Sequence, residues 1–400
     1  MIRTEDHDPF RVLLYSHDSV GLGHIRRNLA LAHTLTAEIP ALTGRSVTGM
    51  LVTGVGHGAD LDVPAGFDVA LLPGVCKGGN GYEPRHMQVP MDDLISIREQ
   101  IVHGVVNGLN PDLIIVDRHP YGVDGELRKA LAATRSRSPE TMIVLGLREV
   151  LDEPEAVARE WASVGDLEEV RDIFDEIWVY GDPQVHDVRV TGEVPTELHD
   201  LIHYTGYLAS GRRCVPETDP TELPYVLSMA GGGSDGKEVL TRAASAIVPT
   251  GHRHLVVAGP QMPTEDLAEI QRVAAPGTRV VASVPDGLAT IRRASAVVAM
   301  AGYNTVCEVL TTDTPVLLVP REMPRQEQLI RARGLTAAGA VDLERLADLT
   351  AERLSGWLSA AVQRTAARDH LDLAGLAGVA HRVAALQPGA TVKEFTRVAV

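Results

Sequence analysis

The stretch MAGGGSDG, residues 229–236, decides the fold of this chain of 400 residues. It follows the short apolar run Tyr225–Met229 and precedes the amphipathic stretch Gly236–Val248, so we predict a strand, a tight turn and a helix. Successive glycines leave backbone amides free to surround an anion, and the helix dipole adds about 0.3–1 kcal/mol. The Gly-Lys-Ser/Thr ending of a Walker loop is missing. We interpret the segment as an anion-binding turn; a tight turn without a ligand is the alternative.

The same alternation of short apolar runs and longer amphipathic stretches extends along the chain in both directions. Runs of this kind suit strands buried on both faces of a parallel sheet. We expect strands at Val12–Tyr15, Val47–Thr53, Val69–Leu72, Leu113–Asp117, Met142–Leu147, Ile177–Tyr180, Tyr225–Met229, His254–Ala258, Arg279–Ser283, Ala296–Met300 and Val316–Val319. We expect helices at His24–Glu38, Asp92–Val106, Val123–Arg137, Gly236–Val248, Thr264–Ala274, Tyr303–Thr311 and Gln326–Arg333. Strands that alternate with helices indicate an α/β fold.

The alternation restarts after residues 183–224, which are poor in strand signals and rich in turn-forming residues. A new strand then begins at Tyr225 and runs into the glycine-rich turn, as the first strand of the chain runs into its own. We therefore predict two Rossmann-like domains that face each other across a cleft, residues 1–204 and 205–385. For the tail, residues 386–400, we leave open a return to the first domain.

The first glycine-containing loop, SHDSVGLGHIRRN at residues 16–28, also joins a strand to a helix. A dinucleotide-binding fingerprint needs a third glycine where Arg26 stands, which disfavours NAD binding. His24 lies at the junction of loop and helix, where an imidazole faces the ligand crevice and titrates near neutral pH. A helix-capping or surface histidine is the alternative interpretation. Asp117 ends a strand and is a candidate to orient His24, with Asp18 as the second choice.

Further polar residues follow the later strands of the chain. Asn304 and Thr305 begin a helix after a strand, and Glu308 lies one turn beyond Asn304 on the same helix face. A carboxylate at such a place can accept the hydroxyl hydrogens of a ribose. The strand Val316–Val319 ends in proline and leads into a polar cluster that contains Arg325, Glu327 and Gln328. The strand end Gly146–Glu149 is also expected to line the cleft.

Composition excludes several classes of protein. The formal net charge of −16, from 37 basic and 53 acidic residues, argues against binding to nucleic acid. Three cysteines without a Cys-x-x-Cys pair disfavour a disulfide framework or a zinc site. No apolar stretch reaches the ~18 residues of a membrane span, and the N-terminus lacks the pattern of a signal peptide. We expect a cytoplasmic protein, with peripheral contact at the inner face of the membrane left open.

In this order and spacing, the motifs resemble GT-B glycosyltransferases, above all the MurG-like group with a glycosyltransferase family 28 C-terminal domain. The turn Gly232–Gly236 matches the GGSxG motif of that group, and Gly302–Thr305 with Glu308 matches its SGxxTxxE motif. Glu327 and Gln328 resemble the acidic-Gln pair that holds donor-sugar hydroxyls in natural-product glycosyltransferases. The segment Gly21–His24 resembles a Gly-Gly-His loop whose histidine is a proposed base.

The chain also departs from the pattern of this group. Met300 stands where a histidine or arginine often touches the diphosphate, and Asp313-Thr314 replaces the glycine before Pro315. Arg26-Arg27-Asn28 replaces the proline-containing continuation of the MurG loop. The resemblance therefore points to a separate bacterial branch rather than to MurG itself.

The resemblance implies a UDP- or dTDP-sugar as co-substrate, no further cofactor and no obligatory metal. His24 would act as base in an inverting transfer, with Asp117 behind it. The donor diphosphate would contact Gly232, Gly233, Ser234, Asn304, Thr305 and Arg325. The nucleoside would contact Val284, Gly302 and Glu308, and the donor sugar Glu327 and Gln328. A 2-epimerase of UDP-sugars and an inactive sugar-nucleotide-binding protein are the alternatives.

The acceptor is expected against Gly23 and against the glycine-rich, locally basic loop Gly74–Pro90, with Arg85 and His86 as contacts. Long loops of this composition are usually functional or disordered, so a plain mobile loop is the other interpretation. A small molecule, a polymer or a lipid-linked compound would each fit as acceptor.

Overall fold

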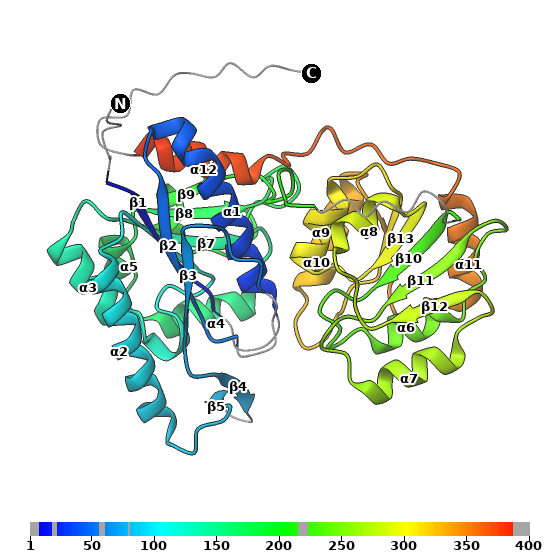
Figure 1. Cartoon of the computed structure of the whole chain (residues 1–400), viewed down its shortest axis with the longest axis horizontal. Coiled ribbons are helices and arrows are strands. Elements are labelled where there is room, and N and C mark those ends of the chain that lie inside the picture. The colour runs from blue at the N-terminus through cyan, green and yellow to red at the C-terminus, as the bar shows by residue number, and fades with distance from the viewer. Residues whose placement is uncertain (1–7, 18–21, 56–60, 79–80, 215–222, 387–400) are drawn as a thin grey trace, which may run out of the picture.

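The computed structural model describes residues 8–17, 22–55, 61–78, 81–214 and 223–386, which form two α/β domains side by side (Figure 1). Asp18 and Gly21 lie outside the described residues. In the sheet of the first domain the strand order is β3-β2-β1-β6-β7-β8-β9, and in that of the second it is β12-β11-β10-β13-β14-β15. Neighbouring strands pair in parallel throughout both sheets. The predicted fold class is thereby confirmed.

The first domain is formed by alternating strands and helices. Its sheet contains β1 (Phe10–Tyr15), β2 (Val47–Thr53), β3 (Phe67–Leu71), β6 (Leu113–Asp117), β7 (Met142–Arg148), β8 (Glu176–Tyr180) and β9 (Ile202–Tyr204). Its helices are α1 (Gly23–Thr43), α2 (Met91–Leu109), α3 (Arg128–Arg137), α4 (Pro154–Val164) and α5 (Leu167–Ile173), with 3₁₀ turns at Val123–Gly125 and Thr196–Leu201. A separate antiparallel hairpin pairs β4 (Val75–Gly78) with β5 (Gly81–Pro84).

The second domain repeats the alternation. Its strands are β10 (Tyr225–Met229), β11 (Arg253–Val257), β12 (Thr278–Val281), β13 (Ala296–Ala299), β14 (Val316–Leu318) and β15 (Asp342–Leu343). Its helices are α6 (Lys237–Ala244), α7 (Thr264–Val273), α8 (Gly287–Arg293), α9 (Tyr303–Leu310), α10 (Glu327–Ala337) and α11 (Ala351–Ala361). Every residue of β10 and β13 is buried, as expected for central strands covered by helices on both faces.

The helix expected over Val123–Arg137 is wrong in its first third. Residues 123–125 form a 3₁₀ turn in which Asp124 has a φ of +46°, and α3 begins only at Arg128. The buried carboxylate of Glu126 accepts hydrogen bonds from Tyr15 and Arg98, which belong to β1 and α2. These long-range contacts hold the segment out of the helix, and its local sequence does not predict them.

The helix α12 (Gly375–Leu386) crosses back to the first domain and packs against α1 (Figure 1). Its buried residues Leu376, Val379 and Val383 belong to the same apolar cluster as Leu31 and Leu35 of α1. The expected boundary had kept residues up to 385 in the second domain, and the contacts of α12 correct this. Most of the predicted tail, residues 387–400, lies outside the described residues.

The chain crosses from the first domain to the second and later returns, and the two crossing segments pair in antiparallel direction. Tyr207 and Ser210 donate backbone hydrogen bonds to Asp372 and Leu373, and Gly375 donates back to Tyr207, at 2.8–2.9 Å. At Gly375 an added Cβ would lie 2.3 Å from a backbone oxygen of the other crossing, so only glycine allows this approach. None of the helices in the described ranges is long and apolar enough to cross a membrane.

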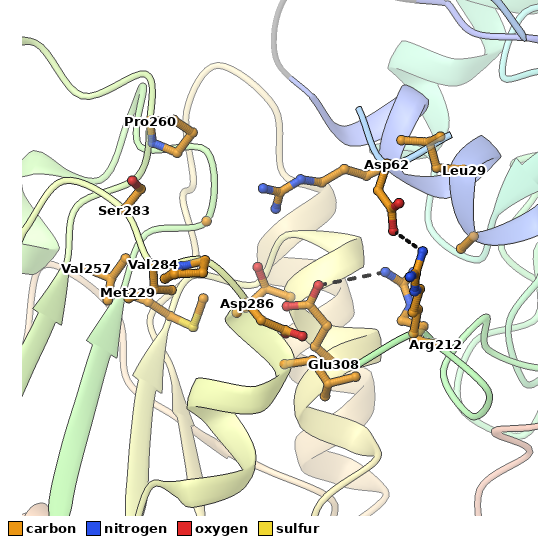
Figure 2. A pocket seen from close by; sticks show the side chains of 18 of the residues that line it. Leu29, Asp62, Arg212, Met229, Val257, Pro260, Ser283, Val284, Asp286 and Glu308 are labelled. Atoms are coloured by element: carbon orange, nitrogen blue, oxygen red, sulfur yellow. Dashed lines mark hydrogen bonds and ion pairs between the residues drawn. The ribbon is translucent and has the colours of Figure 1, made fainter. Parts of the chain in front are cut away.

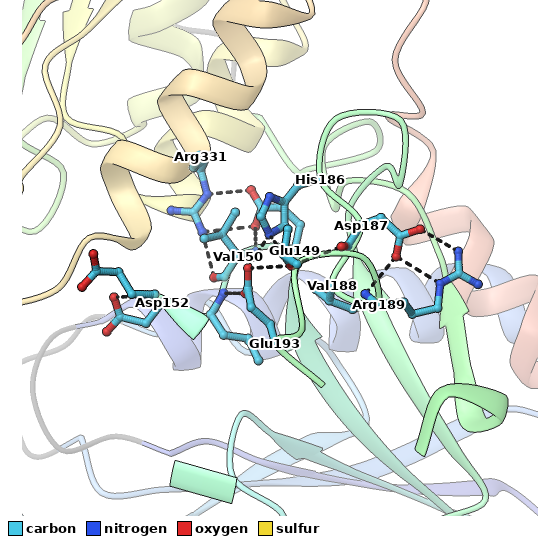
Figure 3. A network of polar contacts seen from close by, with 12 residues as sticks. Glu149, Val150, Asp152, His186, Asp187, Val188, Arg189, Glu193 and Arg331 are labelled. Atoms are coloured by element: carbon cyan, nitrogen blue, oxygen red, sulfur yellow. Dashed lines mark hydrogen bonds and ion pairs between the residues drawn. The ribbon is translucent and has the colours of Figure 1, made fainter. Parts of the chain in front are cut away.

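The two domains share a buried polar interface. The guanidinium of Arg331, on α10, donates to both carboxylate oxygens of Glu149 at 2.6 and 3.1 Å (Figure 3). The hydroxyl of Tyr303, at the start of α9, donates to the carbonyl of Tyr180 at 2.9 Å. Arg27 and Arg331 each lie 5.6 Å from the centre of the Tyr303 ring. These contacts fix how the strand ends of the two sheets face one another.

Candidate active site

Two neighbouring cavities occupy the space between the domains. The first has a volume of about 320 Å³ and is lined by residues that include Met229, Val284 and Glu308 (Figure 2). The second has a volume of about 240 Å³ and is lined by residues that include His24 and Gln328. Arg26, Gly231 and Thr305 line both cavities. They therefore form parts of one cleft at the carboxyl ends of the parallel strands, where α/β proteins bind ligands.

The glycine turn after β10 forms the floor of the cleft. Gly232 and Ser234 line the second cavity. Gly233 lies beneath them with a φ of +94°, and an added Cβ there would be 2.5 Å from the carbonyl oxygen of Ala258. The turn thus packs backbone to backbone against the loop after β11, which only glycine permits. The predicted anion-binding residues are brought together here, while their ligand stays a prediction.

The start of α9 forms the wall beside this turn. Asn304, Thr305 and Gly302 line the second cavity. Asn304 is already engaged, because its Nδ2 donates to the carbonyl of Gly23 at 2.8 Å and its Oδ1 accepts from Arg212 at 2.9 Å. Asn304 therefore links the second domain to the loop that carries His24.

Glu308 projects into the first cavity from the next turn of α9. Its carboxylate lies 3.8 Å from Arg212, and its side chain is 16% exposed (Figure 2). Burial raises the pKa of Glu308, and the charge of Arg212 opposes that rise. Arg212 belongs to the crossing between the domains and donates its Nε hydrogen to Leu208. Nothing in the local sequence around Arg212 indicates this role.

The first cavity is bordered by both domains. Val284 lines its wall, and Asp62 of the first domain lies across its mouth, 2.6 Å from a guanidinium nitrogen of Arg213 (Figure 2). The cavity thus has the apolar side chain of Val284 on one wall and a carboxylate at its mouth, and the predicted contact of Val284 with a nucleoside stays a prediction. Gly302, predicted to meet the nucleoside, lines the second cavity instead.

His24, Asp117 and Arg27 form a connected group at the other side of the cleft. His24 Nδ1 lies 2.5 Å from Asp117 Oδ2, and Arg27 donates to Asp117 Oδ1 at 2.6 and 3.1 Å. Burial would raise the pKa of Asp117, but the charge of Arg27 and the hydrogen bonds from His24 and Arg27 hold it below its usual range. The ionised carboxylate keeps the Nδ1 hydrogen of His24 in place, so Nε2 is left as a hydrogen-bond acceptor. Arg27, three residues after His24 on α1, is recognisable from helix spacing.

His17 lies beside His24 and is the centre of a small group of rings. The ring centres of His17 and His24 are 5.9 Å apart, and those of His17 and His119 are 4.3 Å apart. His17 Nε2 lies 3.0 Å from the hydroxyl of Tyr82 on the hairpin. Burial lowers the pKa of His17 to about 3, so this imidazole is neutral. No role was predicted for His17 from the sequence, although it lies only two residues after the end of β1.

Glu327 and Gln328 begin α10 and line the second cavity, both largely buried. Glu327 Oε1 pairs with Arg321, and Glu327 Oε2 is buried without a hydrogen-bond partner among the described residues. Arg325 points elsewhere and donates to Glu160 on α4 at 2.9 Å. Arg321 therefore lines the cavity in place of the predicted Arg325. No role was predicted for Arg321 from the sequence.

The predicted acceptor residues are only partly brought to the cleft. Gly23 lines the second cavity. Arg85 donates to the carbonyl of Val75 at 2.8 Å, and His86 is exposed beyond the hairpin. Neither side chain lines the two cavities, so their contact with an acceptor stays a prediction. Among the described ranges, no three His, Cys, Asp or Glu side chains are grouped to hold a metal ion.

Sequence comparisons show that this chain is similar to glycosyltransferases. Residues 227–370 match the family model of the glycosyltransferase family 28 C-terminal domain. An uncharacterized glycosyltransferase of Methanosarcina mazei is 23% identical over 76% of this chain and 77% of its own. A UDP-N-acetylglucosamine–N-acetylmuramyl-(pentapeptide) pyrophosphoryl-undecaprenol N-acetylglucosamine transferase of Methylobacterium nodulans is 32% identical over 42% of this chain and 48% of its own.

Solved structures show the same fold. MurG of Acinetobacter baumannii aligns with a TM-score of 0.57 at 14% identity, over 94% of this chain and 99% of its own. The calicheamicin glycosyltransferase CalG4 aligns with a TM-score of 0.59 at 16% identity, over 94% and 98%. These likenesses confirm the predicted arrangement of two facing Rossmann-like domains.

Proposed function

We propose that this chain, a glycosyltransferase of the GT-B fold with a family 28 C-terminal domain, moves a sugar from a nucleoside diphosphate to an acceptor hydroxyl. UDP- or dTDP-sugars are the favoured donors. The observation that carries the proposal is the continuity of the cleft. The glycine turn, the start of α9 and Glu308 line two joined cavities, and His24 with its carboxylate partner faces them from the other domain.

The donor would lie along the second domain. Its diphosphate would meet the backbone amides at Gly232 and Ser234 and the start of α9, where the helix dipole favours negative charge. Its ribose would meet Glu308 in the first cavity, and its sugar would meet Glu327 and Gln328 in the second. The arginines of the cleft would supply positive charge to the leaving diphosphate, so we propose a transfer that needs no metal.

The acceptor would enter from the side of the first domain. His24 Nε2 accepts the proton of the acceptor hydroxyl, and the hydroxyl oxygen forms a bond to the anomeric carbon. The bond from that carbon to the diphosphate oxygen breaks, and the nucleoside diphosphate leaves with the electron pair. Attack from the opposite face inverts the anomeric centre. General-base catalysis of this kind contributes about 10²–10⁴-fold to the rate.

Nucleotide binding tests the proposal most directly. Thermal unfolding should be measured with UDP, dTDP, GDP and ADP, and with their common sugars. A ligand that binds only the folded protein adds about 2.7 kcal/mol at 100 times its Kd. We expect one nucleotide to raise the melting temperature of the natural chain, and Glu308→Ala to lose most of that shift. Glu238→Ala is the control, because that carboxylate is 70% exposed on α6.

The products then identify the reaction. With the stabilising nucleotide sugar, the natural chain should transfer sugar only when an acceptor is added, and His24→Ala should bind nucleotide but transfer at least 100-fold more slowly. An epimerised nucleotide sugar formed without acceptor would favour the 2-epimerase instead. Absence of any nucleotide-dependent shift would refute the proposed donor site.

A further inference from the structure

The arginines of the second cavity and its rim differ in how their charges are neutralised. Those that are paired each contact a carboxylate: Arg27 with Asp117, Arg321 with Asp235 and Arg331 with Glu149. Arg26 is exposed at the rim, where water solvates its charge. Arg148 is the exception: it is half-buried with its Nε fully buried, and the described part of the chain offers it no ion pair or hydrogen bond.

Arg148 is the last residue of β7, in register with Tyr180 of β8. Its side chain lines the second cavity together with His24 and Glu327. Its Nε is buried without a hydrogen-bond partner among the described residues. Burial and the positive charge of Arg331 lower the pKa of the Arg148 guanidinium, and the charge of Glu327 only partly opposes this. The free protein therefore leaves a half-buried cation without a directly paired anion, and a buried polar atom without a hydrogen-bond partner is unfavourable.

We propose that Arg148 binds an oxyanion, a phosphate or carboxylate group, that a substrate brings into the second cavity. The planar guanidinium offers several hydrogens to such a group in a fixed geometry. The inference rests on the proposed function in that it takes the cavity as the substrate site. It adds a ligand-binding residue from the first domain, on the side of the cleft opposite the glycine turn.

Two sources supply the same chemistry. One is the diphosphate of the donor, which would then be held from both domains at once. The other is an anionic group of the acceptor, close to the hydroxyl that His24 deprotonates. A neutral sugar hydroxyl is a poorer partner for Arg148, because it brings no negative charge to the guanidinium. The unpartnered Oε2 of Glu327 can accept the hydrogen of such a hydroxyl instead.

The test compares Arg148→Gln and the conservative Arg148→Lys with the natural chain. The control is Arg353→Gln, an arginine of α11 whose side chain is 59% exposed and which pairs with Glu344 outside the cleft. Calorimetry measures binding of UDP and UMP, or the corresponding pair for the preferred base. Inorganic phosphate is then titrated into the protein alone and into the protein saturated with UDP.

We expect Arg148→Gln to lose about tenfold to a hundredfold in affinity for one anion, and Arg148→Lys to lose less. Loss for UDP but not UMP assigns the donor diphosphate as the source. Unchanged UDP binding with loss of phosphate binding to the saturated protein assigns the acceptor. Unchanged binding of UDP and of phosphate, in both variants, overturns the proposal.

Stability provides an independent measurement. Without ligand, Arg148→Gln should melt at or above the temperature of the natural chain, since it removes an unpaired cation. A melting temperature clearly below that of Arg353→Gln would show a structural role and overturn the proposal. If no nucleotide binds the natural chain, the proposed function fails. Phosphate binding to the nucleotide-free protein, lost in Arg148→Gln, then still supports the oxyanion site, and its absence from the natural chain refutes it.

Discussion

Replacing Asp117 with asparagine should destabilise the first domain strongly. The carboxylate is 1% exposed and accepts hydrogen bonds from Arg27, which is 2% exposed, and from His24. Asparagine keeps the shape but leaves the Arg27 guanidinium buried without a counter-charge. Breaking a buried pair in this way costs about 3–5 kcal/mol, a large share of the roughly 5–15 kcal/mol that stabilises a typical protein.

Urea unfolding followed by tryptophan fluorescence measures this effect, because Trp161 and Trp178 are both in the first domain and largely buried. Asp200→Asn is the matched control, since its carboxylate is 62% exposed and pairs with Arg171 in the same domain. Exposed pairs contribute about 0–1 kcal/mol. A loss below about 1 kcal/mol for Asp117→Asn would refute the reasoning.

The effect should also depend on pH. Folding lowers the pKa of Asp117, so its contribution to stability is complete above the unfolded value of about 3.9 and is lost as the pH falls toward the folded value. The difference between Asp117→Asn and the natural chain should therefore shrink in acid. A difference that is constant from neutral pH to about pH 3 would contradict this.

Three further outcomes follow from the cleft. Nucleotide affinity should fall as the pH is lowered, because Glu308, whose pKa burial raises, takes up a proton and accepts fewer hydrogen bonds. Calorimetry should find this pH dependence missing in Glu308→Gln. Gly233→Ala, at a φ of +94°, should cost about 1–3 kcal/mol by urea unfolding and weaken nucleotide binding, whereas Gly104→Ala, in open space on α2, should stabilise by about 0.5–1 kcal/mol. Arg331→Gln leaves the buried Glu149 unpaired and should cost about 3–5 kcal/mol in the same assay; an unchanged unfolding midpoint would contradict that pairing.

The sequence predicted those parts of the fold that depend on local pattern. Each expected strand is present, with ends that match or are shifted by at most two residues, because buried parallel strands appear as uninterrupted apolar runs. The short strands β9 and β15 and the hairpin β4–β5 were missed, since so few residues carry little periodicity. The first turn of the helix expected at Val123 was lost to a contact with Tyr15, 108 residues away along the chain.

The residues of the candidate site were likewise predicted only where a local motif indicates them. The glycine turn, Asn304 and Glu308 follow strands in recognisable motifs, and the structure places them around one cleft. No local motif indicates a role for Arg212 or Arg321. Arg212 reaches the cleft from the crossing between the domains, and Arg321 reaches it from the turn before α10. Long arginine side chains are especially hard to assign from sequence, since the partner that decides their role is distant in the chain.

The paired crossings make the second domain an insertion within the first. The chain leaves the first domain after β9 and returns to it at α12, and the two passages hydrogen-bond to each other. A fragment that ends at residue 204 would lose the helix that covers α1 and expose its apolar face. The two domains are therefore joined by two hydrogen-bonded passages, which resist twisting of one domain against the other more than a single connection does.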